Sequence, residues 1–402
     1  MPDVQIGLVG KPNVGKSTFF AAATLVDVKI APYPFTTIEP NVGIAYVRIP
    51  CVCKEFNVND NPRNSMCING NRFIPVELID IAGLVPGAWQ GRGLGNQFLD
   101  HVRRAAVLIH VVDAAGATDE EGRPVKPGTH DPLRDVEFLE NEIVMWMFQI
   151  LKKDWDRIVR LVEYAKKPVL QVLYERLSGL AVTDSQILTA LQELGLDKKS
   201  PSTWSDDDLL QFVKLLRKLS KPIVIAANKV DIPEAEDNVK RMMKELKDVK
   251  VVPVCAEAEL ALRRAAQKGL VRYLPGDPDF EIVEGAKLTP QQEKALEKIR
   301  EIMRKWGGTG VVQCLNTAVF DVLGMVAVFP VADERKLTDT EGRVLPDVYL
   351  MPRDSTVLDL ARKIHSEIAE KAVCGIDVRT GRRLGLNAKL EHRMVIKIVT
   401  RR

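Results

Sequence analysis

The chain has few cysteines and no long apolar run, and each absence excludes a class of protein. Six cysteines among 402 residues are too few for a disulfide scaffold, so we expect reduced thiols and a cytoplasmic location. Uninterrupted apolar segments of ~18 residues are missing, which argues against a membrane span. The N-terminal stretch MPDVQIGLVG lacks the charged region and cleavage site of a signal peptide. The net charge of +3 is too small to require a nucleic-acid partner on its own.

What is present is the composition of an ordinary globular protein. Hydrophobic residues make up 46% of the chain and charged residues 28%. A length of 402 residues is enough for two or three domains with full cores.

The first motif is a glycine-rich loop between an apolar run and a helical stretch. The run Val4–Val9 is followed by GKPNVGKS and then TFFAAATLV. This strand, loop and helix order is the context in which Gly-x-x-x-x-Gly-Lys-Ser binds nucleotide phosphates, because its backbone N–H groups can turn toward phosphate oxygens. The residues expected to bind phosphate are Gly10, Lys11, Pro12, Asn13, Val14, Gly15, Lys16, Ser17 and Thr18.

Catalytic and magnesium-binding roles follow from the chemistry of phosphoryl transfer. Lys16 is expected to reach the β- and γ-phosphates, and the Ser17 hydroxyl to bind Mg²⁺. In the loop APYPFTTIEPNVG, either Thr36 or Thr37 is expected to contact Mg²⁺ and the γ-phosphate, and we favour Thr37. VELIDIAG predicts a strand that ends in Asp80, whose carboxylate can hold a magnesium-bound water, and the Gly83 N–H can meet the γ-phosphate.

A second set of residues predicts recognition of the base. KPIVIAANKVD reads as a buried strand that delivers Asn228, Lys229 and Asp231. A carboxylate at Asp231 can accept both N1–H and the 2-amino group of guanine, a donor pair that adenine lacks, so the substrate expected is GTP. Asn228 is expected to tie the base loop to the phosphate loop. In VVPVCAEAE, a weaker motif, Cys255 precedes Ala256, whose N–H can touch guanine O6.

These motifs resemble those of a known family. DIAGLVPGAWQGRGLGNQFL and YPFTTIEPNVG are similar to the Obg-type P-loop GTPases, and within them to the YchF-related branch in an archaeal-looking form. Residues 328–399 resemble a TGS domain, a small β-grasp module. The resemblance implies an α/β fold with a doubly wound, mostly parallel sheet, a helical insertion and a C-terminal β-grasp domain.

The same resemblance implies a function. We expect slow GTP hydrolysis that serves as a conformational switch on ribosomes or RNA, by a monomer that alternates between GTP and GDP. Typical YchF proteins carry glutamate in the base motif and prefer ATP, whereas this chain has Asp231; Cys255 stands where serine is usual. The alternatives are a YchF-like ATPase and a non-catalytic, GTP-dependent RNA- or ribosome-binding protein.

Two positions bear on how hydrolysis would work. Leu84 occupies the place where many GTPases carry a water-orienting glutamine, yet Obg-like GTPases commonly have a hydrophobic residue there and still hydrolyse nucleotide slowly. Asn13 matches an asparagine that binds K⁺ in related potassium-dependent GTPases. A turn-forming role for Asn13 is the alternative.

The order of the motifs predicts the domain organisation. We assign residues 1–116 and 220–285 to the G domain, 117–219 to a helical insertion, 286–320 to connecting helices and 321–402 to the TGS domain. Apolar spacing across 131–166 predicts one long helix, with Asp131 and Pro132 at its start.

Two further features are left open by the sequence. Cys51, Cys53 and Cys67, with Asp60 as an oxygen ligand, can form a metal site, but Cys-x-Cys poorly matches usual zinc spacing, so we interpret 50–75 as a loop with free or oxidisable thiols. Cys314 and Cys374 are predicted to be core residues in helical patterns.

Residues 376–402 carry a net charge of +6, which suggests contact with RNA phosphates. Their basic residues are Arg379, Arg382, Arg383, Lys389, Arg393, Lys397, Arg401 and Arg402.

Overall fold

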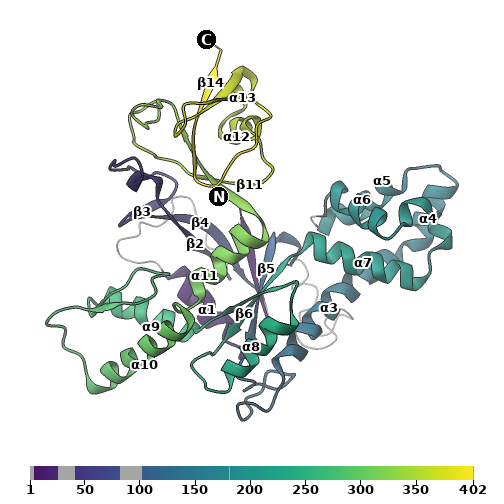
Figure 1. Ribbon diagram of the computed structural model, residues 1–402. Coiled ribbons are helices and arrows are strands. Elements are labelled where there is room, and N and C mark those ends of the chain that lie inside the picture. Colours follow the sequence, from purple (N-terminus) through teal and green to yellow (C-terminus); the bar gives the residue numbers. More distant parts are fainter. Residues whose placement is uncertain (1–3, 26–40, 82–101, 181, 402) are drawn as a thin grey trace.

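Two large β-sheets and a projecting group of helices organise the described part of the chain (Figure 1). The structure is a computed structural model that describes residues 4–25, 41–81, 102–180 and 182–401. The larger sheet has the strand order β2-β4-β1-β5-β6-β7, with β3 paired to β4. β1, β4, β5, β6 and β7 run parallel, whereas β2 and β3 pair with β4 in the antiparallel sense. The strands are β1 (Gln5–Val9), β2 (Val42–Pro50), β3 (Met66–Ile68), β4 (Asn71–Asp80), β5 (Val107–Asp113), β6 (Ile223–Asn228) and β7 (Lys250–Pro253).

Both faces of this sheet are covered, as its strand sequences require. Every residue of β5 is buried, and its side chains alternate between faces. Ile109 and Val111 pack into one apolar cluster with Leu8 and Phe19, whereas Leu108 packs into another with residues of the first arm helix. The helices of this region are α1 (Lys16–Thr24), α8 (Ala235–Glu245), α9 (Ala256–Gln267), α10 (Pro290–Trp306) and α11 (Val311–Asn316). A small hairpin of β8 (Val271–Arg272) and β9 (Glu281–Ile282) follows α9.

The helices between β5 and β6 project from the sheet as an arm, which lies at the right of Figure 1. They are α3 (Pro132–Lys153), α4 (Trp155–Glu163), α5 (Val169–Leu177), α6 (Asp184–Glu193) and α7 (Asp206–Ser220), and we call residues 132–220 the helical arm. Asp131 caps α3 by accepting from the Leu133 N–H, with Pro132 in the first turn. Before α3, residues 117–130 of the expected insertion form a non-helical segment.

The prediction of a single long helix over 131–166 is wrong, because the helix is interrupted at Asp154, between α3 and α4. The Asp154 N–H bonds back to Leu151 and Lys152, and its carboxylate pairs with Arg176 at 2.6 Å. The break turns Trp155 onto Trp204, with ring centroids 5.2 Å apart. Apolar spacing continues through the break, so periodicity alone does not reveal it.

A second sheet forms the C-terminal domain, residues 325–400, at the top of Figure 1. Its strand order is β11-β10-β14-β12-β13, with β10 and β14 parallel. The elements are β10 (Met325–Val331), β11 (Tyr349–Pro352), α12 (Val357–Ile364), α13 (Ser366–Lys371), β12 (Ala372–Asp377), β13 (Arg383–Leu384) and β14 (Met394–Thr400). A strand, a turn and a helix follow one another between residues 347 and 364, as in a β-grasp domain. Cys374, predicted in a helical core, lies instead in β12 and is half-buried, whereas Cys314 is buried in α11.

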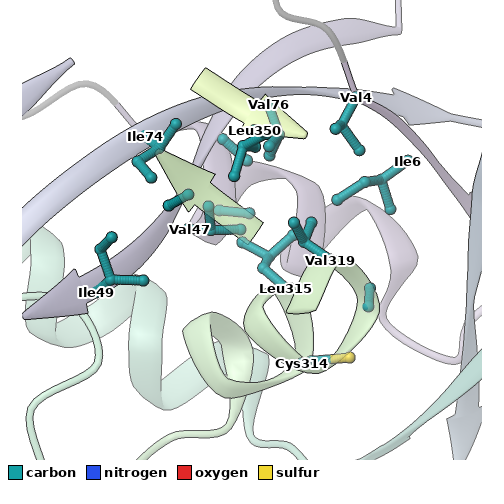
Figure 2. Close-up of a cluster of buried hydrophobic side chains, with 14 of the residues drawn as sticks. Val4, Ile6, Val47, Ile49, Ile74, Val76, Cys314, Leu315, Val319 and Leu350 are labelled. Carbon is teal, nitrogen blue, oxygen red and sulfur yellow. The ribbon is translucent and has the colours of Figure 1, made fainter. Parts of the chain in front are cut away.

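One apolar cluster joins this domain to the large sheet. Figure 2 shows Leu350 of β11 beside Val76 of β4, near Leu315 and Val319. Leu315 lies in α11 and Val319 in a π-helical stretch, Thr317–Val322, that leads into β10. The two sheets therefore share a core. In the described part of the chain, no helix is long and apolar enough to cross a membrane.

Candidate nucleotide site

The glycine-rich loop between β1 and α1 has a backbone that only glycine accommodates at two positions. Gly10 has φ 149°, and a Cβ there would lie 2.5 Å from the Val111 carbonyl oxygen. Gly15 has φ 97°, and a Cβ there would lie 2.3 Å from Asn228 Nδ2. Helix α1 begins at Lys16, directly after this loop, so its N-terminal N–H groups lie at the loop. A helix N-terminus of this kind favours a bound anion.

Lys16, Ser17 and Asp80 lie close together at the end of the loop. Burial lowers the pKa of Lys16, while the nearby Asp80 carboxylate raises it. Burial raises the pKa of Asp80, and Lys16 and a hydrogen bond from Ser17 oppose that rise. Asp80 Oδ1 is buried and has no hydrogen-bond partner among the residues that the structure describes. A hydroxyl beside an unsatisfied carboxylate oxygen is the donor set that Mg²⁺ prefers, so these residues fit a magnesium ion.

Asn228, the last residue of β6, connects three segments of the site. Its Nδ2 donates to the Val14 carbonyl at 2.8 Å, and its Oδ1 accepts from the Ala256 N–H at 3.1 Å. Asn228 is 4% exposed, so both hydrogen bonds are shielded from water. The predicted link between base loop and phosphate loop is present. The Ala256 N–H, expected to face guanine O6, is paired with Asn228 in this structure.

The rest of the base loop is held by charged side chains. Asp231 accepts a hydrogen bond from Cys255 Sγ at 3.5 Å and lies 3.6 Å from the Lys298 ammonium. Its side chain keeps 30% of its surface exposed. Burial and the Asp231 carboxylate raise the pKa of Cys255 to about 12, so this thiol is a hydrogen-bond donor.

Lys229 has φ 67° and pairs with the fully buried Asp113 at 2.9 Å. Asp113, at the end of β5, also accepts from the Thr118 hydroxyl at 3.0 Å and from the Ala115 N–H at 3.1 Å. Asp113 is not among the site residues predicted from the sequence. The available signal is a carboxylate at the end of a strand that is apolar except for His110 and that runs parallel to the strand delivering Lys229.

Lys11 does not direct its side chain toward the phosphate loop. The ammonium is buried and donates to Asp135 of α3 and to the Thr118 carbonyl, each at 3.0 Å. Only the Lys11 backbone remains available for a phosphate, and Pro12 has no N–H to donate. His130 also contacts Asp135, with Nε2 2.8 Å from Oδ1. Pairing across 124 residues of sequence left no local signal for this contact.

Asn13 supports the turn-forming alternative in part. It has φ 62°, and its Nδ2 donates to the Gly122 carbonyl at 2.9 Å. Val14 is buried, and Thr18 lies in the first turn of α1. Thr37, Gly83 and Leu84 lie outside the described residues.

The C-terminal basic residues are more fully paired than their charge suggests. Arg379 and Arg393 both contact Glu55, Lys389 pairs with Asp354 at 2.5 Å, and Lys397 pairs with Glu334. Within residues 4–25, 41–81, 102–180 and 182–401, Arg382, Arg383 and Arg401 form no ion pair. Fewer basic side chains are therefore free to contact RNA phosphates than the net charge of residues 376–402 suggests.

Comparisons with known proteins agree with this architecture. Residues 226–333 match the family described as Obg-like GTPase YGR210-like, G4 motif-containing domain; residues 5–133 match a 50S ribosome-binding GTPase family, and 339–400 match the TGS domain. An uncharacterized GTP-binding protein of Methanocaldococcus jannaschii is 50% identical over 98% of this chain and 99% of its own. The ribosome-binding ATPase YchF of Bacillus subtilis is 34% identical over 63% of this chain and 65% of its own. The crystal structure of a GTP-binding protein from Pyrococcus horikoshii has a TM-score of 0.80 and 38% identity, covering 99% of this chain and 100% of that one.

Proposed function

The chain belongs to the YchF-related branch of the Obg-like P-loop GTPases, and from that premise we propose that it binds GTP and hydrolyses it slowly as a conformational switch. The observation that carries this proposal is that Asn228 forms hydrogen bonds to both Val14 and Ala256. Its 2.8 Å bond to Val14 holds the base loop beside the phosphate loop, so that one nucleotide can reach both.

At the phosphate end, the chain's own groups supply binding and charge. Backbone N–H groups of residues 13–18 and the start of α1 would surround the phosphates, and Lys16 would neutralise charge on the β- and γ-phosphates. Ser17 and Asp80 would hold Mg²⁺ or its water, with Thr37 as a further ligand and the Gly83 N–H at the γ-phosphate. When bound, Mg²⁺ supplies charge neutralisation at the phosphates.

At the base end, Asp231 would set the choice of nucleotide. Its carboxylate is braced by Cys255 and Lys298 and remains partly exposed. Guanine offers it two donors, whereas adenine offers it none and would leave a charge without a partner. Lys229, fixed by Asp113, would border the base pocket beside it.

Hydrolysis would proceed without a side chain that orients water. Leu84 cannot form such a hydrogen bond, so Lys16, the metal and backbone donors would carry the stabilisation of the transition state. A low rate is the expected consequence, and it suits a switch more than a metabolic enzyme.

The proposed partner is the ribosome or other RNA of the translation machinery. Support comes from relatives whose names describe ribosome-binding ATPases and from the match of residues 5–133 to a ribosome-binding GTPase family. The matched TGS segment, with Arg382 and Arg383 forming no ion pair in the described part of the chain, would provide a surface for such a contact.

Phosphate release over many turnovers tests the enzymatic part. Lys16→Ala and Ser17→Ala should each lower GTP turnover by about a hundredfold or more, since each removes transition-state charge stabilisation or a metal ligand. Lys244→Ala, which changes an exposed lysine near the end of α8, serves as the matched control and should turn over like the parent.

Three results would distinguish the alternatives. Phosphate release by the parent no faster than by Lys16→Ala would identify a non-catalytic GTP-binding protein. Faster release from ATP than from GTP would identify an ATPase like the named relatives. Co-sedimentation with ribosomes that does not depend on the nucleotide would contradict the switch.

A further inference from the structure

Four side chains with metal-binding atoms meet between β2 and β4, away from the nucleotide site. They are Cys51, Cys53, Asp60 and Cys67, and their ligand atoms all lie within 4.8 Å of one another. Cys51 and Cys53 are buried, while Asp60 and Cys67 are half-buried. The Cys-x-Cys spacing favours free thiols, but the hairpin of β3 and β4 brings the distant Cys67 to the same point.

The distances within this cluster correspond to the edges of a coordination tetrahedron. Zinc with Zn–S bonds of about 2.3 Å places two sulfur ligands about 3.8 Å apart, and a sulfur and an oxygen ligand about 3.5 Å apart. Cys53 Sγ and Cys67 Sγ are separated by 3.7 Å, and Cys51 Sγ lies 3.2 Å from Asp60 Oδ2. A disulfide would bring the two sulfurs to about 2.05 Å, so Cys53 and Cys67 are not joined in that way.

A second layer of contacts orients the oxygen ligand. Arg72, whose side chain is fully buried, places Nη2 3.0 Å from Asp60 Oδ2 and donates from Nη1 to the Ser65 hydroxyl at 3.0 Å. Outer partners of this kind fix the direction of a ligand and tune its affinity for metal. The guanidinium also offsets the excess negative charge that three thiolates and a carboxylate would leave around a divalent ion. A surface pocket lined by Cys53, Asp60 and Cys67 provides an entry path.

We propose that Cys51, Cys53, Cys67 and Asp60 bind one tetrahedral Zn²⁺ ion. Three soft thiolates and one carboxylate in a closed set of four suit a structural zinc site, and the small span of the cluster leaves room for a single ion. Each thiol gives up its proton to solvent when the metal binds, and no oxidant or reductant is involved.

The ion would fasten the C-terminal domain to the G domain. Directly after Asp60, the Asn61 N–H donates to the Val344 carbonyl at 2.8 Å, and the Arg63 N–H donates to the Pro346 carbonyl at 2.7 Å. Asn64 exchanges two hydrogen bonds with Val348, at 2.9 and 3.0 Å. Arg72 itself donates to the Leu345 carbonyl at 2.9 Å. A metal bound at Asp60 therefore fixes the start of the segment that docks residues 344–348.

Metal analysis of the full chain, purified with reductant and zinc, tests the site. We expect about one zinc per chain in the parent, and less than about a tenth of that in the double variant Cys53→Ser/Cys67→Ser, because structural zinc depends on its thiolates. Cys374→Ser, which removes a half-buried cysteine outside the cluster, is the matched control and should keep its zinc. Zinc absent from the parent after reconstitution, or retained by the double variant, would overturn the site.

Cobalt substitution keeps the test valid if the double variant fails to fold. The parent with Co²⁺ in place of zinc should show the intense visible bands of a tetrahedral ion and a thiolate charge-transfer band. Asp60→Asn, which preserves side-chain size, should bind cobalt at least about tenfold more weakly. Bands typical of six oxygen or nitrogen ligands, or no bands at all, would contradict the assignment.

Hydrogen exchange tests the docking role. Chelation of the metal should speed amide exchange at residues 344–348 and 61–64, and should leave exchange in the helical arm unchanged. Zinc bound at one per chain with unchanged exchange at 344–348 would show that the ion does not hold the C-terminal domain. GTP binding has no part in these readouts, so their outcome is independent of the proposed function.

Discussion

The helical arm and the C-terminal domain each share an apolar cluster with the large sheet, but the region of the arm also has polar contacts with the phosphate loop. The buried Lys11 contacts Asp135 and the Thr118 carbonyl, and the exposed Asn13 contacts the Gly122 carbonyl just before the arm begins. The C-terminal domain is joined by an apolar core that includes Leu350 and by the segment after Asp60.

The difference suggests different roles for the two attachments. Polar contacts of the phosphate loop can respond to the charge of a bound nucleotide. The segment that holds Thr118, Gly122 and Asp135 would therefore respond to the presence of phosphate. The contacts of the C-terminal domain, apolar at Leu350 and polar after Asp60, lie on segments other than the phosphate loop. We infer that a bound nucleotide affects the arm more directly than it affects the C-terminal domain.

Breaking the polar attachment is expected to have the largest effect. Asp135→Asn leaves the Lys11 ammonium buried without its counter-charge, which should lower the free energy of unfolding of the G domain by about 3 to 5 kcal/mol. Chemical denaturation measures this. GTP affinity should fall as well, because Lys11 lies in the phosphate loop.

Asp248→Asn is the control for this comparison. It removes an exposed ion pair with Lys218, at 2.8 Å, and should change stability by less than about 1 kcal/mol. If Asp135→Asn lowered the free energy of unfolding as little as Asp248→Asn, the contact between Lys11 and Asp135 would not contribute to stability as we expect.

Breaking the apolar attachment should cost somewhat less and leave nucleotide binding unchanged. Leu350→Ala removes a buried side chain from the shared core and should destabilise the protein by about 2 to 3 kcal/mol. Leu188→Ala, at a 39% exposed position on α6, should be close to neutral. A substantial loss of GTP affinity in Leu350→Ala would contradict the separation between the two attachments.

The sequence predicted the parts of the site that depend on local chain signals. Glycines and apolar runs located β1, the phosphate loop and α1, and the strands that end at Asp80 and Asn228. What it could not predict depends on distant partners. Lys11 turns toward Asp135, and Cys67 joins Cys51 and Cys53 through the β3–β4 hairpin, because tertiary register rather than local spacing decides both contacts.

A smaller effect is expected at the surface of the C-terminal domain. Because Arg379 is engaged with Glu55, the test of RNA contact uses Arg382→Ala/Arg383→Ala. Removing two phosphate contacts should reduce the slope of log affinity for ribosomes against log salt by about one or more, with GTP affinity unchanged.

Arg157→Ala/Arg160→Ala changes two exposed arginines on α4 of the arm and is the matched comparison. If this pair flattened the salt dependence and the C-terminal pair did not, the partner would bind the arm rather than the C-terminal domain.

The smallest expected effect concerns potassium. If Asn13 binds K⁺ through its side-chain oxygen, hydrolysis should be faster in K⁺ than in Na⁺, because a bound cation offsets charge in the transition state, and Asn13→Ala should remove the difference. Single-turnover rates in the two salts measure this. Equal rates in the parent would assign Asn13 to its turn and its contact with Gly122 alone.

We expect above all that this chain selects GTP over ATP by recognising the guanine base. Equilibrium binding of GTP and ATP to the parent and to Asp231→Glu tests this most directly. The parent should bind GTP at least about tenfold more tightly than ATP, because Asp231 pairs with the guanine edge and has no partner on adenine. Asp231→Glu keeps the charge but shifts the carboxylate by one methylene, and should narrow that ratio. Equal affinities of the parent for GTP and ATP, or tighter binding of ATP, would contradict the account.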